Sequence, residues 1–334
     1  MKSNYARHQL VRIARIIPPL RYLHDQRNTL LERVAWLEYA HRNNATLSEE
    51  LGTLRDQVAY TETRRAQGHI VEFDYPYQPQ VRSWDGAADS FWKRLISSRT
   101  DAYRQLLSSF LAYGASMATI ATNEPIDERE PYWSNPWFPP LDAICLTGLL
   151  AHLNPRRFVE VGSGISTKFA RRAITAHNLR TKILSIDPAP RAVVDELCDV
   201  VIRKPLENCD LSIFNDLCSE DVLFMDNSHR SFQGSDVTIF FTEILPRLNS
   251  GCLYGIHDIF LPHDYPDAWR LRYYNEQYLL MAYLLGGARG DEVVLPVHYV
   301  QLITELFAIL EPIVRRPVNQ GILAVGGAFW LRRA

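Results

Sequence analysis

The sequence predicts an α/β protein whose main domain is a doubly wound, mostly parallel sheet, preceded by an N-terminal helical extension. Three observations support this fold class. From about residue 157, short apolar runs alternate with segments of helical periodicity, the pattern of strand–helix units that build parallel sheets. Several of these runs end on Gly, Asp or His, where open α/β sheets bind their ligands. The first 70 residues instead repeat leucine at helical spacing.

Composition excludes several classes of protein. The chain has 334 residues, of which 47% are hydrophobic, and a formal net charge of −2. This length suits about two domains, and the charge argues against a general nucleic-acid binder. The 5 cysteines include no CxxC pair, so neither a disulfide scaffold nor a structural zinc site is expected. No apolar run is long enough for a membrane span. Because Arg12 and Arg15 interrupt the N-terminal apolar run, we expect no signal peptide and a cytoplasmic protein.

Residues 1–67 form a predicted helical arm. The chain up to residue 70 carries 11 Lys and Arg against 7 Asp and Glu. Leu23, Leu30 and Leu37 are seven residues apart, with Val34 between them, which is the spacing of one helix face. We predict a short basic helix first, and then one or two long amphipathic helices to about residue 65. Their apolar face packs on the body of the protein or on a second subunit of a homo-oligomer; a basic membrane-surface helix is the weaker alternative.

Residues 68–140 are richer in aromatic residues and proline, and we predict a lid or substrate-binding region there. A helical stretch is expected over residues 89–118. The segment from Tyr132 to Pro140 cannot be a helix interior, because its prolines lack the N–H donor and clash with the preceding turn. It is therefore expected to be a loop that leads into a helix over residues 141–153.

Residues 141–334 form the predicted ligand-binding domain, in which strands and helices alternate. Strands are expected over residues 158–161, 183–186, 200–202, 222–225, 252–256, 293–300 and 322–331. Helices are expected over residues 166–177, 192–197, 235–248 and 269–285. Units of this length predict a parallel sheet with helices on both faces.

The first strand runs into the sequence Glu160-Val-Gly-Ser-Gly-Ile-Ser-Thr167. Gly162 and Gly164 allow a tight turn and close approach of a ligand to the backbone. The segment is a poor nicotinamide fingerprint, because Thr167 stands where that motif needs a third Gly or Ala. Asp187 ends the next strand, and an acidic residue there suits the two hydroxyls of a ribose. Together they favour a nucleoside ligand over a plain strand–helix turn.

Two more strand ends have acidic and histidine side chains, in the sequences Asp226-Asn-Ser-His229 and His257-Asp258. Because the ends of parallel strands meet at one edge of the sheet, these side chains are expected to face one crevice. Carboxylates with imidazoles can hold a divalent cation. His229 can alternatively act as a general base, and a cluster of helix-capping residues is the simplest alternative.

These motifs, over about residues 130–300, resemble those of class I S-adenosylmethionine-dependent methyltransferases, which are Rossmann-like. The branch that they resemble contains bacterial small-molecule and sugar O-methyltransferases. The segments at residues 135–142 and 259–266 look like those of a widespread bacterial subgroup. The resemblance implies S-adenosylmethionine as cofactor and a small-molecule acceptor, such as a sugar, glycoside or polyketide-type compound. The residues that would bind the cofactor are Glu160, Gly162, Ser163, Gly164, Thr167, Asp187 and Asp226.

The same resemblance implies a catalytic arrangement. In similar metal-dependent enzymes, the strand-end Asp and a later acidic pair hold magnesium, and the residue three after that Asp accepts the proton. Asp226 would then be a metal ligand and His229 the base, with His257 and Asp258 as the later pair. His257 departs from the pattern, because imidazole suits zinc or iron better than magnesium. The alternatives are a non-catalytic scaffold that keeps the fold and, less favoured, a nicotinamide-dependent oxidoreductase.

Overall fold

A computed structural model describes residues 18–40, 45–82 and 87–334, and the chain divides into two compact units between Gln78 and Pro79. The short basic helix predicted before Pro18 lies outside the described residues. The predicted boundaries at residues 67 and 140 remain predictions. Among the helices in the described ranges, none combines the length and the apolar character that crossing a bilayer requires.

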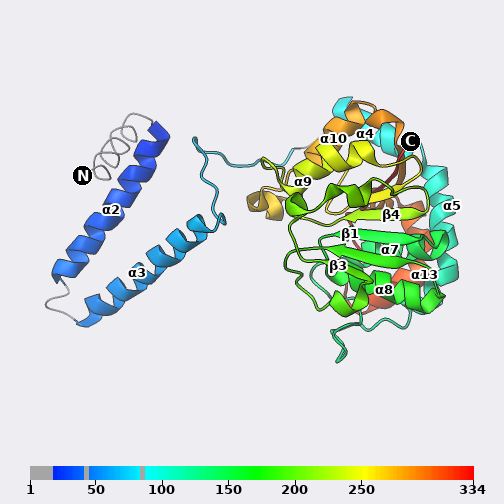
Figure 1. The fold of residues 1–334 in the computed structure, drawn as a ribbon, viewed down its shortest axis with the longest axis horizontal. Helices are drawn as coiled ribbons and strands as arrows, with labels where there is room; N and C mark the ends of the chain where they lie inside the picture. Colours follow the sequence, from blue (N-terminus) through cyan, green and yellow to red (C-terminus); the bar gives the residue numbers. More distant parts are fainter. Residues whose placement is uncertain (1–17, 41–44, 83–86) are drawn as a thin grey trace. The chain divides into compact units, whose positions relative to one another are not determined.

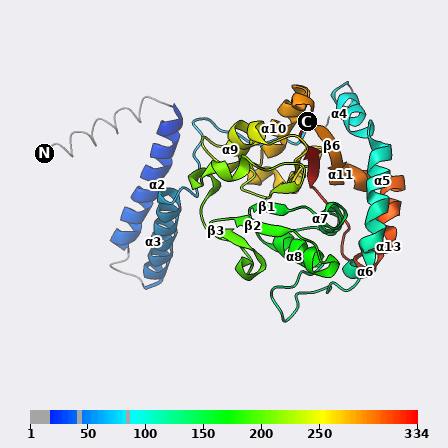
Figure 2. The same ribbon diagram turned by 45° about the vertical axis from the view of Figure 1, so that its right-hand side comes forward.

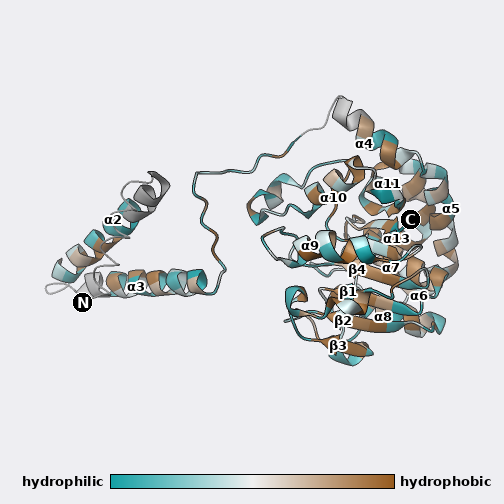
Figure 3. Cartoon of the chain, turned by 45° about the horizontal axis from the view of Figure 1, so that its top comes forward, coloured by the Kyte–Doolittle hydropathy of each residue, from teal (hydrophilic) through white to brown (hydrophobic). Residues whose placement is uncertain are grey.

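The N-terminal unit contains two long helices in contact with each other, α2 (Pro18–Ala40) and α3 (Ala45–Ala66) (Figure 1). This confirms the prediction of long helices to about residue 65. Leu37 and Leu51 are buried, at 2% and 3% exposure, whereas Leu30 remains 49% exposed. Both helices carry hydrophobic and hydrophilic segments in Figure 3. The contact between the helices therefore covers only part of the leucine repeat.

The second unit is built on a seven-stranded sheet of order β3-β2-β1-β4-β5-β7-β6. Its strands are β1 (Arg157–Val161), β2 (Lys182–Ile186), β3 (Val200–Ile202), β4 (Asp221–Met225), β5 (Leu253–Ile256), β6 (Glu292–Pro296) and β7 (Phe329–Arg332). The first five are parallel, and β7 is antiparallel to both β5 and β6. The predicted doubly wound, mostly parallel sheet is thus confirmed. Val161 pairs with Met225, which brings the turn after β1 beside the turn after β4.

Helices cover the sheet on both sides (Figure 2). α7 (Pro140–Leu153) and α8 (Ile165–His177) pack against each other, and α5 (Thr100–Phe110) packs on α7. α9 (Asp236–Ile239) and α10 (Glu276–Leu285) lie on the other side of the strands. The core is strongly aromatic: the ring of Phe224 on β4 stacks on Trp330 of β7, with 5.1 Å between ring centroids.

Several predicted helices are shorter or broken. The stretch over residues 89–118 is divided into α4 (Ala87–Ser97), α5, a 3₁₀ turn (Leu111–Tyr113) and α6 (Gly114–Met117). The helix over residues 192–197 is only a 3₁₀ turn, Asp195–Leu197. The helix over residues 235–248 passes from α9 through a π segment, Phe240–Ile244, to a 3₁₀ turn, because Pro246 lacks the N–H that an α-helix needs. The helix over residues 269–285 is interrupted where Tyr273 takes φ 55°.

The last two predicted strands are also shorter. The strand expected over residues 293–300 ends at Pro296 and continues as α11 (Val297–Leu302). The strand expected over residues 322–331 is regular only in β7, at its C-terminal part. The reason lies in tertiary contacts: the N–H groups of Gly327 and Ala328 are bound by the Asp142 carboxylate of α7 rather than by a neighbouring strand.

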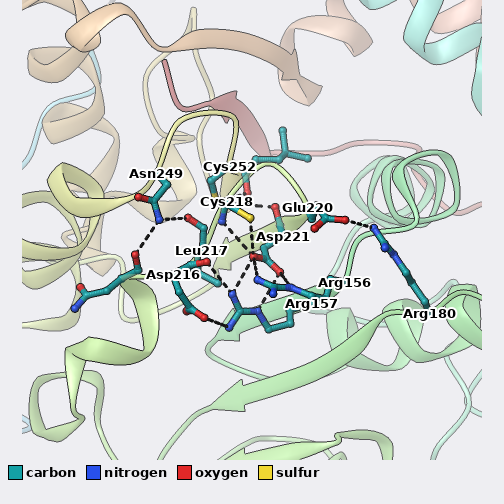
Figure 4. A network of polar contacts seen from close by, with 12 residues as sticks. Arg156, Arg157, Arg180, Asp216, Leu217, Cys218, Glu220, Asp221, Asn249 and Cys252 are labelled. Atoms are coloured by element: carbon teal, nitrogen blue, oxygen red, sulfur yellow. Dashed lines mark hydrogen bonds and ion pairs between the residues drawn. The ribbon is translucent and has the colours of Figure 1, made fainter.

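At the amino ends of the strands, a polar network joins β1 to β4 (Figure 4). The guanidinium of Arg156 donates to Asp221 at 2.8 Å, and that of Arg157 donates to the same carboxylate at 2.9 Å. Burial alone would raise the pKa of Asp221, but the two arginines hold it well below its usual range. This carboxylate therefore has a structural role, because its oxygens are held by the two arginines.

Candidate functional site

A cavity of about 750 Å³ opens at the carboxyl ends of β1, β2 and β4. Its wall contains six of the residues that the sequence singled out, namely Gly162, Ser163, Gly164, Asp187, Asp226 and His229. The aromatic and cationic part of the wall consists of Tyr132, Trp137, Phe138, Lys168, Arg191, Arg230 and Tyr274. Three loops far apart in the sequence thus meet at one cavity, as expected for an open α/β sheet.

The turn after β1 depends on two glycines in different ways. Gly162 has φ 82°, and a Cβ there would lie 1.7 Å from the carbonyl oxygen of Asp226. Gly164 has extended backbone with φ 177°, and a Cβ there would meet no atom within 4 Å. Gly162 is therefore required by the fold, whereas at Gly164 a side chain would only occupy the cavity. That open space is what close approach of a ligand to the backbone needs.

Glu160 and Thr167 lie behind this turn, and neither lines the cavity. The Thr167 hydroxyl donates to the Glu160 carboxylate and accepts from the N–H of Gly164 at 3.1 Å. Burial raises the pKa of Glu160 to about 8. The structure therefore gives both residues a supporting position, and their predicted contact with a cofactor remains a prediction.

Asp187 sits at the rim of the cavity and is tied to the glycine turn. One of its carboxylate oxygens accepts from the N–H of Ser163 at 2.7 Å, and the other accepts from the N–H of Ala189 at 2.8 Å. These bonds orient the carboxylate but leave one acceptor direction on each oxygen. The half-buried group can therefore still accept from two neighbouring hydroxyls.

His229 is held in the cavity wall by a residue 47 positions later in the chain. Its Nδ1 lies 3.0 Å from Oε2 of Glu276, the first residue of α10. Its ring packs against Tyr274, with 4.7 Å between centroids. Nε2 lies 3.5 Å from Asp226 and 3.4 Å from Asp258. The orientation of the ring is thus set by Glu276, and Nε2 is the nitrogen on the side of the strand-end carboxylates.

Two residues of this cluster have a strained backbone. His229 has φ 59° and Asp258 has φ 57°, a left-handed conformation that residues other than glycine seldom adopt. Such strain persists where the surroundings impose it, and it is often found at functional sites. Both residues follow strands of the sheet, and their side chains meet at His229 Nε2.

His257 is enclosed by two carboxylates. Its Nε2 lies 3.1 Å from Asp142 of α7, and its Nδ1 lies 3.1 Å from Asp226. Asp142 and His257 are 115 residues apart in the chain and both are buried. The His257 ring therefore links Asp142 on α7 to Asp226 at the end of β4.

The charges in this cluster are strongly coupled. Burial alone would lower the pKa of His229, but Asp226, Asp258 and Glu276 outweigh it and raise the pKa well above its ordinary value. The pKa of His257 is raised in the same way, by Asp226, Asp258 and Asp142 against burial. Conversely, the two imidazoles hold the pKa of Asp226 well below its usual range despite burial. Asp226, which lies between the two imidazoles, is therefore the electrostatic centre of the site.

The donors do not fit the metal site that the sequence suggested at Asp226, His257 and Asp258. Among the residues that the structure describes, no group of three His, Cys, Asp or Glu side chains is arranged to hold a metal ion. Both ring nitrogens of His257 already face carboxylate oxygens, so it has no lone pair directed at a cation.

Neither Asp142 nor Glu276 was among the predicted site residues. Asp142 ends the approach motif at residues 135–142, which was a usable signal, whereas no local signal marks Glu276.

Parts of the chain are similar to known proteins. Residues 159–259, from β1 to just beyond β5, match the family model of a methyltransferase domain. A 102-residue stretch is 31% identical to an uncharacterized protein of Archaeoglobus fulgidus; it covers 29% of this chain and 46% of that protein, so the chain spans about half the length of this relative. The SAH-bound methyltransferase PaMTH1 of Podospora anserina aligns with 72% of this chain and 95% of its own, at 16% identity and a TM-score of 0.37.

Fold and site together therefore define a Rossmann-like α/β domain with a cavity at the carboxyl ends of its strands. Within it, the segment at residues 159–259 is similar to methyltransferase domains.

Proposed function

We propose that this protein is an S-adenosylmethionine-dependent methyltransferase that methylates a hydroxyl group of a small molecule or sugar. One observation carries the proposal. The cavity joins an open glycine turn, hydrogen-bonded to the rim carboxylate Asp187, to an oriented histidine, His229. The first part suits a nucleoside cofactor, and the second suits removal of a proton from an acceptor. The match of residues 159–259 to a methyltransferase domain supports the same conclusion.

The residues at the turn fit this cofactor. Gly164 leaves the backbone open to the cavity, and Asp187 offers an acceptor direction on each oxygen for the ribose hydroxyls. The cofactor supplies a methyl group on a positively charged sulfur, which needs no further activation. The protein must therefore place the acceptor oxygen in line with that methyl group and take its proton.

His229 is the residue that we propose as the base. With the cofactor bound as the source of the methyl group, the acceptor hydroxyl would give its proton to Nε2 of His229 as its oxygen is methylated. The Glu276 carboxylate accepts a hydrogen bond from the N–H at Nδ1, which leaves the lone pair on Nε2 for the proton of the acceptor. General base help of this kind contributes about 10²–10⁴-fold. Because the pKa of His229 is raised, the ring must lose a proton before turnover, so the rate should rise with pH.

Aromatic side chains provide the wall for the acceptor. The ring of Trp137 is half exposed and has the guanidinium of Arg191 4.4 Å from its centroid, and the Arg230 guanidinium lies 5.0 Å from the centroid of Tyr274. Flat, partly exposed rings of this kind suit a sugar or an aromatic acceptor.

We further propose that the apolar surface of α2 and α3 mediates self-association of the protein.

Calorimetry with S-adenosylhomocysteine tests the cofactor site. We expect Asp187→Ala to weaken binding about tenfold or more, through loss of the ribose contacts, and Gly164→Val to abolish it by filling the cavity. Asp101→Ala is the matched control, because Asp101 is an exposed helix residue of α5, paired with Arg104, that does not line the cavity. Unchanged affinity in both site variants would refute the proposal.

A second assay tests the base. Transfer of a labelled methyl group to a panel of sugars and phenols would identify an acceptor. With that acceptor, His229→Gln should lose about 10²-fold or more in kcat while its affinity for S-adenosylhomocysteine stays near wild type. Full turnover by this variant would remove His229 from the mechanism without affecting the cofactor assignment.

A further inference from the structure

The surroundings of His257 differ from those of a metal ligand. The side chain lies at the end of β5 and is buried. Phe138 packs on the ring with 5.2 Å between centroids, and Phe224 lies at 6.0 Å. The two nitrogens lie 3.1 Å from Asp142 and 3.1 Å from Asp226. Packing and hydrogen bonds together therefore hold the ring in one orientation.

Asp142 is itself fixed by the backbone of the segment before β7. Its Oδ2 accepts from the N–H of Gly327 at 2.8 Å as well as facing His257, and its Oδ1 accepts from the N–H of Ala328 at 2.8 Å. The carboxylate is fully buried on α7. A buried carboxylate with three hydrogen-bonding groups around it is held in one orientation. It is therefore a firm support for the His257 ring.

The hydrogen bonds set the charge of the ring. An ionised carboxylate accepts hydrogen bonds and offers no proton. Because both ring nitrogens of His257 face carboxylate oxygens, each nitrogen is a donor, and a ring that donates from both nitrogens is a cation. The ring thus places a positive charge against Asp226, on the side where the resemblance to metal-dependent enzymes would place a divalent ion.

We propose that His257, held by Asp142, takes the place of a divalent metal ion in this site. The ring fixes the Asp226 carboxylate and balances its charge, so methyl transfer at this site requires no divalent cation. Asp142 is a positioning residue that acts through His257. The inference rests on the proposed function for the use of the site, but the arrangement of the donors can be tested without any activity.

The competing arrangement uses His229 instead. Its Nε2 lies between Asp226 and Asp258, at 3.5 and 3.4 Å. In this alternative, those three side chains would be the ligands of a cation. Asp226 Oδ1, however, is the atom that His257 Nδ1 approaches at 3.1 Å, so a cation there would stand beside the imidazolium ring. That repulsion is the physical reason to expect no metal, and direct metal binding distinguishes the two arrangements.

The first experiment uses the unaltered full-length protein with Mn²⁺ alone as the probe. After treatment with EDTA and desalting, titration followed by electron paramagnetic resonance should show no saturable binding, with or without S-adenosylhomocysteine. Elemental analysis of the purified protein should find well under one equivalent of any divalent metal. One equivalent of Mn²⁺, bound tightly and lost in Asp258→Asn, would overturn the proposal.

The second experiment removes the His257 ring, which is proposed to exclude a metal ion from the site. A variant that combines Asp142→Asn with His257→Glu replaces the cationic ring by a carboxylate beside Asp226 and Asp258, a donor set of oxygens that Mn²⁺ favours. This variant should gain one saturable Mn²⁺ site. If it remains folded by circular dichroism and binds no Mn²⁺, then His257 is not what excludes the ion, and the proposal is wrong.

Asp291→Asn is the matched control. Asp291 is another buried acid, bound by the hydroxyl groups of Tyr254 and Tyr283, and it lies near the amino end of β5, away from the cavity. It should cost stability without creating a Mn²⁺ site. If S-adenosylhomocysteine fails to bind the wild type, the proposed function fails, whereas the Mn²⁺ results still decide the arrangement of His257.

Discussion

Gly162 offers a sharp test of how the turn after β1 is built, through the substitution Gly162→Ala. Its φ of 82° is unfavourable for alanine, and the new Cβ would lie 1.7 Å from the carbonyl oxygen and 2.6 Å from the carbonyl carbon of Asp226. The obstacle is backbone, so no side chain can rotate away. The turn after β1 or the end of β4 must move instead.

The cost can be worked out from these two effects. The left-handed backbone conformation costs alanine about 1–2 kcal/mol. Forcing an extra methyl group into close-packed structure costs roughly 1–3 kcal/mol more. For a domain of this size, each kcal/mol lowers the melting temperature by roughly 2–4 °C. We therefore expect the free energy of unfolding to fall by about 2–5 kcal/mol and the melting temperature to fall by at least about 4 °C.

Gly164→Ala is the matched control for this substitution. It adds the same methyl group two residues later, where φ is 177° and no atom lies within 4 Å. Thermal and urea unfolding followed by circular dichroism should show a clear loss for Gly162→Ala and almost none for Gly164→Ala. Equal unfolding transitions for the two variants would refute the reasoning, because the positive φ of Gly162 and the nearby carbonyl of Asp226 are what distinguish the two positions.

Three further predictions concern charge and association. Glu276→Gln removes a carboxylate that raises the pKa of His229. The rise of kcat/KM with pH should therefore move to lower pH by about one unit or more. An unchanged pH profile would contradict the role of Glu276. Burial raises the pKa of Glu160 to about 8 from an ordinary 4.5, so the folded protein loses stability as pH rises through that window. In urea unfolding, Glu160→Gln should therefore be more stable than wild type at pH 9 but not at pH 4. An equal effect at both pH values would argue against a buried neutral carboxyl group. Trp36 on α2 is 63% exposed, so Trp36→Glu should reduce the mass measured by light scattering if the arm mediates self-association, and an already monomeric wild type would end that proposal.

Much of the fold followed from local pattern. Strands such as β1, β2 and β4 are short, mostly apolar runs followed directly by Gly or Asp, and this signal needs no knowledge of distant residues. The shorter helices were harder to place, because their ends depend on single residues. Tyr273 breaks one helix by adopting φ 55°, and Pro246 changes the hydrogen bonding of another. Propensity averaged over a window does not resolve such breaks.

The site shows the same division between local and distant information. The sequence alone determined which strand ends carry chemistry, because Gly162, Asp187, Asp226 and His229 each follow a recognisable apolar run, and parallel strands bring their ends together. Only the tertiary structure decided what these side chains do. Glu276 reaches His229 across 47 residues and Asp142 reaches His257 across 115. Such contacts form only when helices pack on the assembled sheet, so no periodicity or spacing in the sequence shows which two residues will meet. They place His257, which was expected to be a metal ligand, between two carboxylates.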